Sequence, residues 1–368
     1  MLNLTVNNWH YLHGGPLFDA TIKQSLVDFK VTETLSFEPS GSGEHQFLYI
    51  EKAGQNTAFV AEELAKFAKL PLRAVSYAGR KDKYATTYQW FGIYFGGKQQ
   101  KSRKSPVVKP SDINWNDFSL PGVRILQYTQ NDRKLRTGSI KHNAFDIVLR
   151  NIDSINTTQL HARLSQIRNM GVPNYFGNQR FGEIIKSDGS VQLGGNLQLA
   201  EKLVNGEAIR NRNKNSMAIS ALRSWLFNQF VSHRLQQTDF LHVLDGDALS
   251  LSGSNSFFIA NNTSDEHERL ISKDINLTAP MWGKGQLDTK AQALAFEQQL
   301  ASQYQPVCTT LEALSLEQQR RNILLYPQDL QAEVSEHEVC LRFSLPSGCF
   351  ATSVLREIAQ VNIGRHAE

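Results

Sequence analysis

The sequence predicts an α+β protein, with strand-rich segments at both ends of the chain around a helix-rich middle. Short runs near the two ends alternate apolar and polar residues, or are rich in aromatic and β-branched residues, which is typical of strands. In the middle, apolar residues recur every three or four positions, which indicates amphipathic helices. With 368 residues, 40% of them hydrophobic, the chain has enough apolar material for two domains with their own cores.

Strands are predicted at 46–50, 88–95, 144–150 and 337–345. In the third, Phe145, Ile147 and Leu149 share one face; in the last, the residues that share a face are Val339, Leu341, Phe343 and Leu345. After the first strand we expect a helix capped by Asn56 or Thr57. Its core face should carry Phe59, Val60, Leu64, Phe67 and Ala68.

The middle of the chain has a helical pattern over 217–235, where the apolar positions are Ile219, Leu222, Leu226 and Phe230, and over 290–304. We therefore predict a discontinuous domain, made of residues 1–169 and 319–368, that is interrupted by a helix-rich domain over 170–318.

Composition excludes several classes of protein. No apolar run is long enough to span a membrane, and the N-terminal segment lacks the pattern of a signal peptide. Three cysteines without C-x-x-C spacing argue against a disulfide scaffold or a zinc site and predict a cytoplasmic protein. The net charge of +4 is too small to identify a nucleic-acid partner without clustering.

Sequence motifs give no support to a bound nucleotide, metal or other cofactor. The chain has no G-x-x-x-x-G-K-[ST] or G-x-G-x-x-G motif and no H-E-x-x-H pair. The acidic and histidine clusters at 265–268 and 336–338 are interpreted as exposed charge.

The densest polar segment is SYAGRKDKYATTYQWF at 76–91, where Arg80, Lys81 and Lys83 surround a single carboxylate, Asp82. An aspartate is ionised at neutral pH, so neighbouring cations serve to orient it rather than to activate it. A positioned carboxylate beside cations suits attack on an electrophilic carbon of a nucleic-acid component, although a charged loop tip would have the same composition.

Basic residues also gather in two stretches that contain no acidic residue. The first, 98–109, includes Lys101, Arg103 and Lys104; the second, 210–214, includes Arg210 and Arg212. Each stretch by itself fits a solvated loop, but together with Arg133, Lys134, Arg136 and Lys141 they make a phosphate-binding face plausible.

Eight segments, in order along the chain, resemble the TruD family of tRNA pseudouridine synthases. They are DFKVTE (28–33), GSGEHQFLYIEKAGQNT (41–57), SYAGRKDKYATTYQWF (76–91), KLRTGSIKHNAFDIVLR (134–150), GVPNYFGNQRFG (171–182), GDALSLSGS (246–254), LLYPQDL (324–330) and LRFSLPSGCFATSVLRE (341–357). The resemblance implies a catalytic domain with an antiparallel sheet and a central cleft, into which a helix-rich α+β TRUD domain is inserted.

The activity that the resemblance implies is isomerisation of uridine to pseudouridine in tRNA, with uridine-13 as the family's usual bacterial target. No cofactor or metal is needed, because nothing is oxidised and nothing leaves. Asp82 matches the family's catalytic aspartate. The choice between its attack on C1′ of the ribose and assistance to a glycal route is left open.

The resemblance also implies a pocket for an extruded base. Phe29, Phe145 and Phe350 match family aromatics that resemble pocket walls, and Asn143 matches an asparagine suited to the uracil edge. Lys23 and Lys81 are both candidates for the cation that pairs with Asp82. Arg80, Lys83 and the two basic stretches are expected to contact the RNA backbone.

Two other functions remain open from the sequence. The first is a non-catalytic RNA-binding or RNA-chaperone protein of the same fold; the second is a hydrolase with an aspartyl intermediate, for which no metal ligands or phosphate loop are visible. No protein partner is implied, and the absence of a long apolar surface stripe predicts a monomer.

Overall fold

The computed structural model describes residues 4–6, 9–96, 108–185, 191–237, 240–254, 256–261, 264–314 and 316–364. The chain forms two compact units, each assembled from segments far apart in the sequence. The sheet unit consists of Pro16–Arg168, Pro327–Ala351 and Ile358–Glu368. The helical unit consists of Met1–Gly15, Asn169–Tyr326 and Thr352–Glu357. The helical unit thus contains all of 170–318 together with flanking segments; which unit is catalytic stays a prediction.

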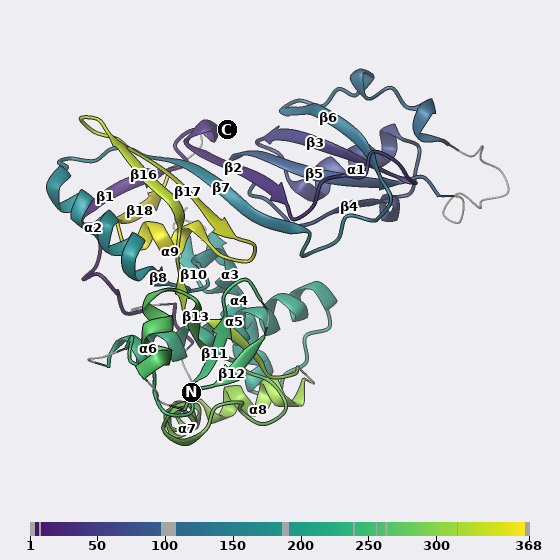
Figure 1. Ribbon diagram of the computed structural model, residues 1–368. Helices are drawn as coiled ribbons and strands as arrows, with labels where there is room; N and C mark the ends of the chain where they lie inside the picture. Colours follow the sequence, from purple (N-terminus) through teal and green to yellow (C-terminus); the bar gives the residue numbers. More distant parts are fainter. Residues whose placement is uncertain are drawn as a thin grey trace. The chain divides into compact units, whose positions relative to one another are not determined.

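The sheet unit is built on an eight-stranded, mostly antiparallel sheet (Figure 1). Its order is β16 (Gln328–Val334), β17 (Val339–Pro346), β7 (Ile140–Leu149), β2 (Phe29–Leu35), β5 (Thr86–Tyr94), β3 (His45–Ala53) and β6 (Val123–Asn131), with β4 (Val75–Tyr77) also paired to β5. Only the β2–β5 pair is parallel among the pairs of this sheet. All four predicted strands lie in it, and the α+β class is confirmed.

Outside this sheet, the described part of the sheet unit also has a parallel strand pair and α-helices. The pair joins β1 (Phe18–Ile22) to β18 (Ala359–Ile363), so it brings together the first and last strands of the chain. These helices are α1 (Thr57–Phe67) and α2 (Thr157–Met170). The last two residues of α2 belong to the helical unit. Helix α9 (Ala351–Arg356) has its first residue in the sheet unit and the others in the helical unit.

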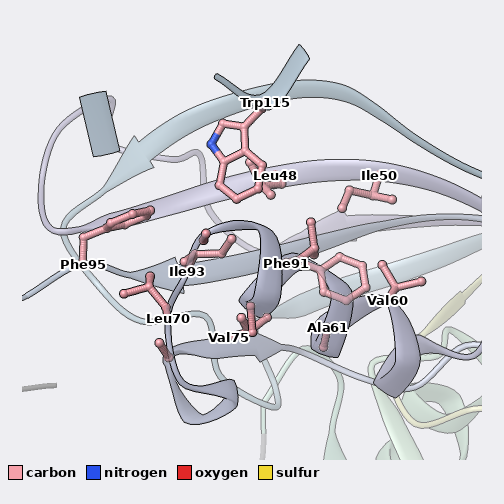
Figure 2. Close-up of a cluster of buried hydrophobic side chains, with 14 residues drawn as sticks. Leu48, Ile50, Val60, Ala61, Leu70, Val75, Phe91, Ile93, Phe95 and Trp115 are labelled. Carbon is pink, nitrogen blue, oxygen red and sulfur yellow. The ribbon is translucent and has the colours of Figure 1, made fainter. Parts of the chain in front are cut away.

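Helix α1 covers one face of the sheet beside β3 and β5. Apolar side chains from these three elements form a common core, which Trp115 closes at one side (Figure 2). The predicted helix is confirmed, but its predicted core face is wrong at Phe59, which is 39% exposed. The buried face is centred on Val60, Ala61 and Leu64, and a residue at position 59 points roughly away from that centre at 100° per residue.

The helical unit contains a small antiparallel sheet and most of the long helices. Its sheet has the order β12 (Phe257–Ile259), β11 (Ala248–Leu251), β13 (Ile275–Met281) and β14 (Gln319–Asn322). Two further strand pairs are β8 (Val172–Pro173) with β15 (Leu324–Leu325), and β9 (Glu183–Ile185) with β10 (Val191–Leu193). The helices are α3 (Asn178–Phe181), α4 (Gly195–Val204), α5 (Arg212–Leu235), α6 (Ser264–Ile271), α7 (Ala291–Gln303) and α8 (Gln305–Ala313).

Both predicted helices of the middle region are present, 217–235 within α5 and 290–304 as α7. Leu222, Leu226 and Phe230 of α5 are almost completely buried. Along the part of the chain that the structure describes, no helix combines the length and the apolar character needed to cross a bilayer.

Candidate active site

The loop between β4 and β5, which carries Asp82, is held by buried polar side chains at three successive points. Gln89 donates a hydrogen bond to the main-chain oxygen of Gly79 at 3.3 Å. The main-chain N–H of Lys81 donates to Thr57 Oγ1 at 3.0 Å, and Lys52 Nζ donates to the main-chain oxygen of Asp82 at 2.8 Å. Since Gln89 and Lys52 have no exposed surface and Thr57 only 2%, water does not compete for these bonds.

The strand pattern explains why polar groups lie under this loop. Lys52 follows Leu48 and Ile50 at the same phase of β3, so it points to the face that α1 covers. Gln89 is the cross-strand partner of Ile50 and shares that face. Thr57 begins α1, and its hydroxyl also donates to Gln89 Oε1 at 3.0 Å.

The Asp82 carboxylate forms an ion pair with Lys23, with 2.7 Å between Lys23 Nζ and Asp82 Oδ2. The Lys23 side chain is only 8% exposed, whereas that of Asp82 is 31% exposed and therefore accessible from solvent. Lys23 directly follows β1 and has a φ of 56°, a left-handed conformation that is uncommon outside glycine. Its ammonium group also lies 4.4 Å from the centre of the Phe29 ring, a cation–π contact.

Lys81, the other candidate for this role, pairs with a different carboxylate. Its ammonium group lies 2.6 Å from Glu33 Oε2, and the Glu33 side chain is fully buried. The second oxygen of Glu33 accepts a hydrogen bond from the main-chain N–H of Trp90 at 3.3 Å. Of the two lysines that the sequence left open, the structure therefore places Lys23 on the Asp82 carboxylate and Lys81 on Glu33.

Lys52 is the most deeply buried cation of the site. Its side chain reaches the main-chain oxygens of Gln55 and Asp82 at 3.0 and 2.8 Å. Burial disfavours the charged form and lowers the pKa of Lys52 to about 8; the charge of Asp82 opposes this shift and the charge of Lys81 adds to it.

Aromatic side chains from three neighbouring strands line the same face of the sheet. Phe145 on β7 stacks on Phe343 of β17, with ring centres 5.4 Å apart, and contacts Phe29 of β2 edge-on at 6.3 Å. Phe29 and Phe343 are buried, whereas Phe145 is partly exposed. The three rings form an aromatic row with its accessible member in the middle.

Asn143 lies beside this row. It is two residues before Phe145 on β7, and its cross-strand partner on β2 is Glu33. Its side-chain oxygen Oδ1 is buried and has no hydrogen-bond partner among the described residues. Because leaving a buried acceptor unpaired costs about 1–3 kcal/mol, this oxygen indicates a place where a donor can be received.

Comparison with known proteins identifies the family. A family model described as tRNA pseudouridine synthase D (TruD) matches residues 5–200 and 198–358. The chain belongs to the TruD family. It is 45% identical to the tRNA pseudouridine synthase D of Pseudoalteromonas atlantica over 97% of both chains, and 41% identical to that of Shewanella oneidensis over 95% of this chain and 88% of the relative.

The fold agrees with that of a solved structure. The crystal structure from Methanosarcina mazei described as a tRNA pseudouridine synthase D matches 98% of this chain and 97% of its own, with a TM-score of 0.70. At 18% sequence identity this likeness concerns the fold alone.

The structure brings together six of the residues expected from the TruD resemblance: Asp82, Lys23, Lys81, Phe29, Phe145 and Asn143 all belong to one side of the sheet unit. Phe350 lies directly before α9, also in the sheet unit, and is partly exposed. Their roles in the reaction stay predictions.

The basic residues expected to contact the RNA backbone belong to both units. Arg80 and Lys83 flank Asp82 and are exposed, while Arg210 and Arg212 are exposed before and at the start of α5 in the helical unit. Lys101, Arg103 and Lys104 lie outside the described residues. Within the described ranges, no group of three or more histidine, cysteine or acidic side chains is arranged to hold a metal ion.

The sequence patterns did not identify Glu33, Lys52 and Thr57 as parts of the site, or Phe343 as part of the aromatic row. A usable signal was present for two of them: Glu33 follows Phe29 and Val31, and Lys52 follows Leu48 and Ile50, at the buried phase of their strands. A charged residue at such a position is rare unless it is paired or hydrogen-bonded, so it marks a functional region.

Lys52 should give the protein a specific dependence of stability on pH. Its pKa is about 8 when folded and near 10.5 when unfolded, so between these values the unfolded chain binds the extra proton and stability rises with pH. Each unit between the two pKa values corresponds to about 1.4 kcal/mol. Relative to Lys52→Met, the wild-type protein should therefore gain about 3 kcal/mol in free energy of unfolding across this range. Urea unfolding of both proteins between pH 7.5 and 10.5 measures it, and parallel curves would contradict it.

Proposed function

We propose that the chain converts uridine-13 of tRNA to pseudouridine, with Asp82 as its catalytic residue. Formation of pseudouridine in tRNA follows from membership of the TruD family; the position in the tRNA and the role of the aspartate are the finer parts of the proposal. The observation that carries them is an accessible carboxylate, 31% exposed, on a loop whose main chain is bonded to buried side chains at three points.

The reaction rearranges bonds within one nucleotide. The bond between N1 of uracil and C1′ of ribose breaks, the base turns over, and a bond from C5 to C1′ forms. C5 loses its proton, and N1 takes up a proton in its place. An Asp82 carboxylate that attacks C1′, or one that assists loss of a ribose proton on a glycal route, needs the same property: an ionised oxygen held at one place and orientation.

Lys23 supplies the orientation. Its bond to Oδ2 fixes one oxygen of the carboxylate at 2.7 Å, and its own position is fixed by burial and by the contact with Phe29. A charge-assisted hydrogen bond of this kind is shorter and about twice as strong as one between neutral groups. Lys23 thus acts as the partner cation of Asp82, and Lys81 keeps the buried Glu33 neutralised beside it.

The aromatic row and Asn143 form the proposed pocket for the base. The uracil must leave the helical stack before the bond at C1′ becomes accessible, and a flipped base is commonly held by stacking and by contacts to its polar edge. Phe145 presents the accessible ring, with Phe29 and Phe343 behind it. The unpaired Oδ1 of Asn143 suits the N3–H donor of uracil. Phe350 is proposed as a further wall.

Basic side chains are proposed to hold the tRNA backbone. Arg80 and Lys83 project beside Asp82, where phosphates near the target nucleotide would lie. We expect that other phosphates of the tRNA are contacted by Arg210 and Arg212, together with Lys101, Arg103 and Lys104 from the other basic stretch. We further propose that the protein works as a monomer in the cytoplasm, where its tRNA substrate is made.

Replacing Asp82 by Asn tests the catalytic role. The substitution keeps shape but removes the ionised oxygen, so pseudouridine formation should fall to below about one-thousandth of the wild-type rate. Tritium release from tRNA labelled at uridine C5 measures turnover, and filter binding should show tRNA affinity within about twofold. The matched control is Asp132→Asn, at a side chain that is 57% exposed. Substantial turnover by Asp82→Asn would refute the assignment, and a wild-type protein that binds tRNA without turnover would favour the RNA-chaperone alternative.

Replacing Phe145 by Leu tests the base pocket. Stacking of an aromatic side chain on a base contributes about 1–3 kcal/mol, so kcat/KM should fall about 5- to 150-fold. Phe67→Leu makes the same change at a partly buried phenylalanine in the core under α1 and should leave kcat/KM nearly unchanged. Equal effects of the two substitutions on kcat/KM would assign Phe145 to the core instead.

The basic residues at α5 should contribute to the salt dependence of tRNA affinity. Each lost phosphate contact should reduce the slope of log affinity against log salt by about 1. Arg210→Ser combined with Arg212→Ser should therefore lower the slope by up to about 2, whereas Lys202→Ser on α4 should leave it unchanged. Binding isotherms for tRNA between 50 and about 300 mM salt measure the slope. A slope equal to that of the wild-type protein would remove these arginines from the interface.

A further inference from the structure

We propose that Lys52 is a positioning residue for Asp82, whose charged, buried ammonium group fixes the main chain at the catalytic aspartate and thereby the direction of its carboxylate. This inference rests on the proposed function of Asp82 as the catalytic residue. It concerns a side chain that touches the main chain of the catalytic loop rather than the reacting nucleotide.

The environment of Lys52 is unusual for a charged side chain. The residue has 0% exposed surface, yet within the described residues its ammonium group makes no ion pair. Its hydrogen bonds go to two main-chain oxygens, of Gln55 and Asp82. A buried charge without an ion-pair partner costs several kcal/mol, and an apolar side chain at this phase of β3 would extend the core that Leu48 and Ile50 begin. Retaining a lysine here is therefore unfavourable for folding and needs another reason.

Lys52 joins two main-chain segments, one at Gln55 and one at Asp82. Gln55 lies in the turn that leads from β3 to α1, and Asp82 lies in the loop that leads from β4 to β5. A single ammonium group bonds to both turns at 3.0 and 2.8 Å. The next loop contact, from Lys81 N–H to Thr57, ties the same loop to the first residue of α1. Lys52 and Thr57 thus hold two consecutive loop residues, Asp82 and Lys81, beside the β3–α1 turn. We call this set of contacts the clamp.

The hydrogen bond from Lys52 lies directly at the proposed catalytic residue, Asp82. Lys52 holds the main-chain oxygen of the residue whose side chain is proposed to react, so a shift of this oxygen moves the carboxylate with it. A misplacement of about 1 Å in a reacting group can cost about 100-fold in rate. The ammonium group of Lys52 also attracts the Asp82 carboxylate electrostatically, in addition to Lys23.

The buried surroundings of Lys52 make its charge sensitive to pH. From the Asp82 loop, the carboxylate of Asp82 favours its protonated form and the ammonium group of Lys81 disfavours it. Its cross-strand neighbours, Thr87 on β5 and Val123 on β6, carry no charge. Burial is the largest influence and lowers the pKa of Lys52 to about 8, so the clamp loses its charge just above neutral pH.

The experiment compares Lys52→Met with Lys66→Met, an identical change at an α1 lysine whose side chain is 70% exposed. Single-turnover rates and tRNA affinities are measured for both variants and the wild-type protein at pH 7.0. Lys52→Met should lose about 100-fold in rate with tRNA affinity within about twofold, and Lys66→Met should match the wild type. A wild-type single-turnover rate in folded Lys52→Met would overturn the inference.

A second measurement uses the wild-type protein, so it does not depend on folding of the variant. Its single-turnover rate should fall as the pH rises from 7 through about 8 to 9.5, with tRNA saturating throughout. Folded Lys52→Met should lack this alkaline decline. A flat wild-type profile, or the same decline in Lys52→Met, would overturn the inference. If the wild-type protein forms no pseudouridine under any of these conditions, the proposed function fails instead, so the two failures are distinguishable.

Discussion

The proposed active site depends on the burial of polar side chains beneath the loop that carries Asp82. Gln89, Thr57 and Lys52 each bond to the main chain of this loop, and none of them has appreciable contact with solvent. Hydrogen bonds in a low-dielectric interior are stronger than in water, and an unsatisfied partner there is expensive. The loop is therefore held in one conformation, and the carboxylate at its tip keeps a constant position without needing regular secondary structure of its own.

The three lysines around the loop bond to different partners. Lys23 bonds to the accessible carboxylate of Asp82, and Lys81 bonds to the fully buried carboxylate of Glu33. Lys52 bonds to main-chain oxygens. Three cations thus face two carboxylates in this network, so it carries more positive than negative groups, which favours the approach of a phosphate-bearing substrate.

The large sheet places residues from distant parts of the sequence on a single face. Phe29, Phe145 and Phe343 come from three neighbouring strands, and cross-strand register brings the centre of the Phe145 ring to 6.3 Å from that of Phe29 and 5.4 Å from that of Phe343. A shift of register by one residue would turn each ring to the opposite face. The apolar alternation over 145–149 in β7 and over 339–345 in β17 disfavours that shift, because it would expose buried residues of both strands.

Local patterns in the sequence were sufficient for the class of the fold, and they singled out the loop that carries the candidate residue Asp82. Period-two alternation located β7 and β17, helical spacing located α5 and α7, and the cations around Asp82 marked the loop. Each of these signals arises from residues that are neighbours along the chain, so it can be read without knowledge of tertiary contacts.

Only the tertiary structure decided which groups meet. Lys81 is adjacent to Asp82 in sequence but bonds to Glu33, and Lys23, 59 positions away, takes the Asp82 carboxylate. Lys52 joins the site because strand pairing and the packing of α1 bring the β3–α1 turn beside the loop. Side-chain direction and strand register govern these contacts, and neither is encoded by distance along the chain.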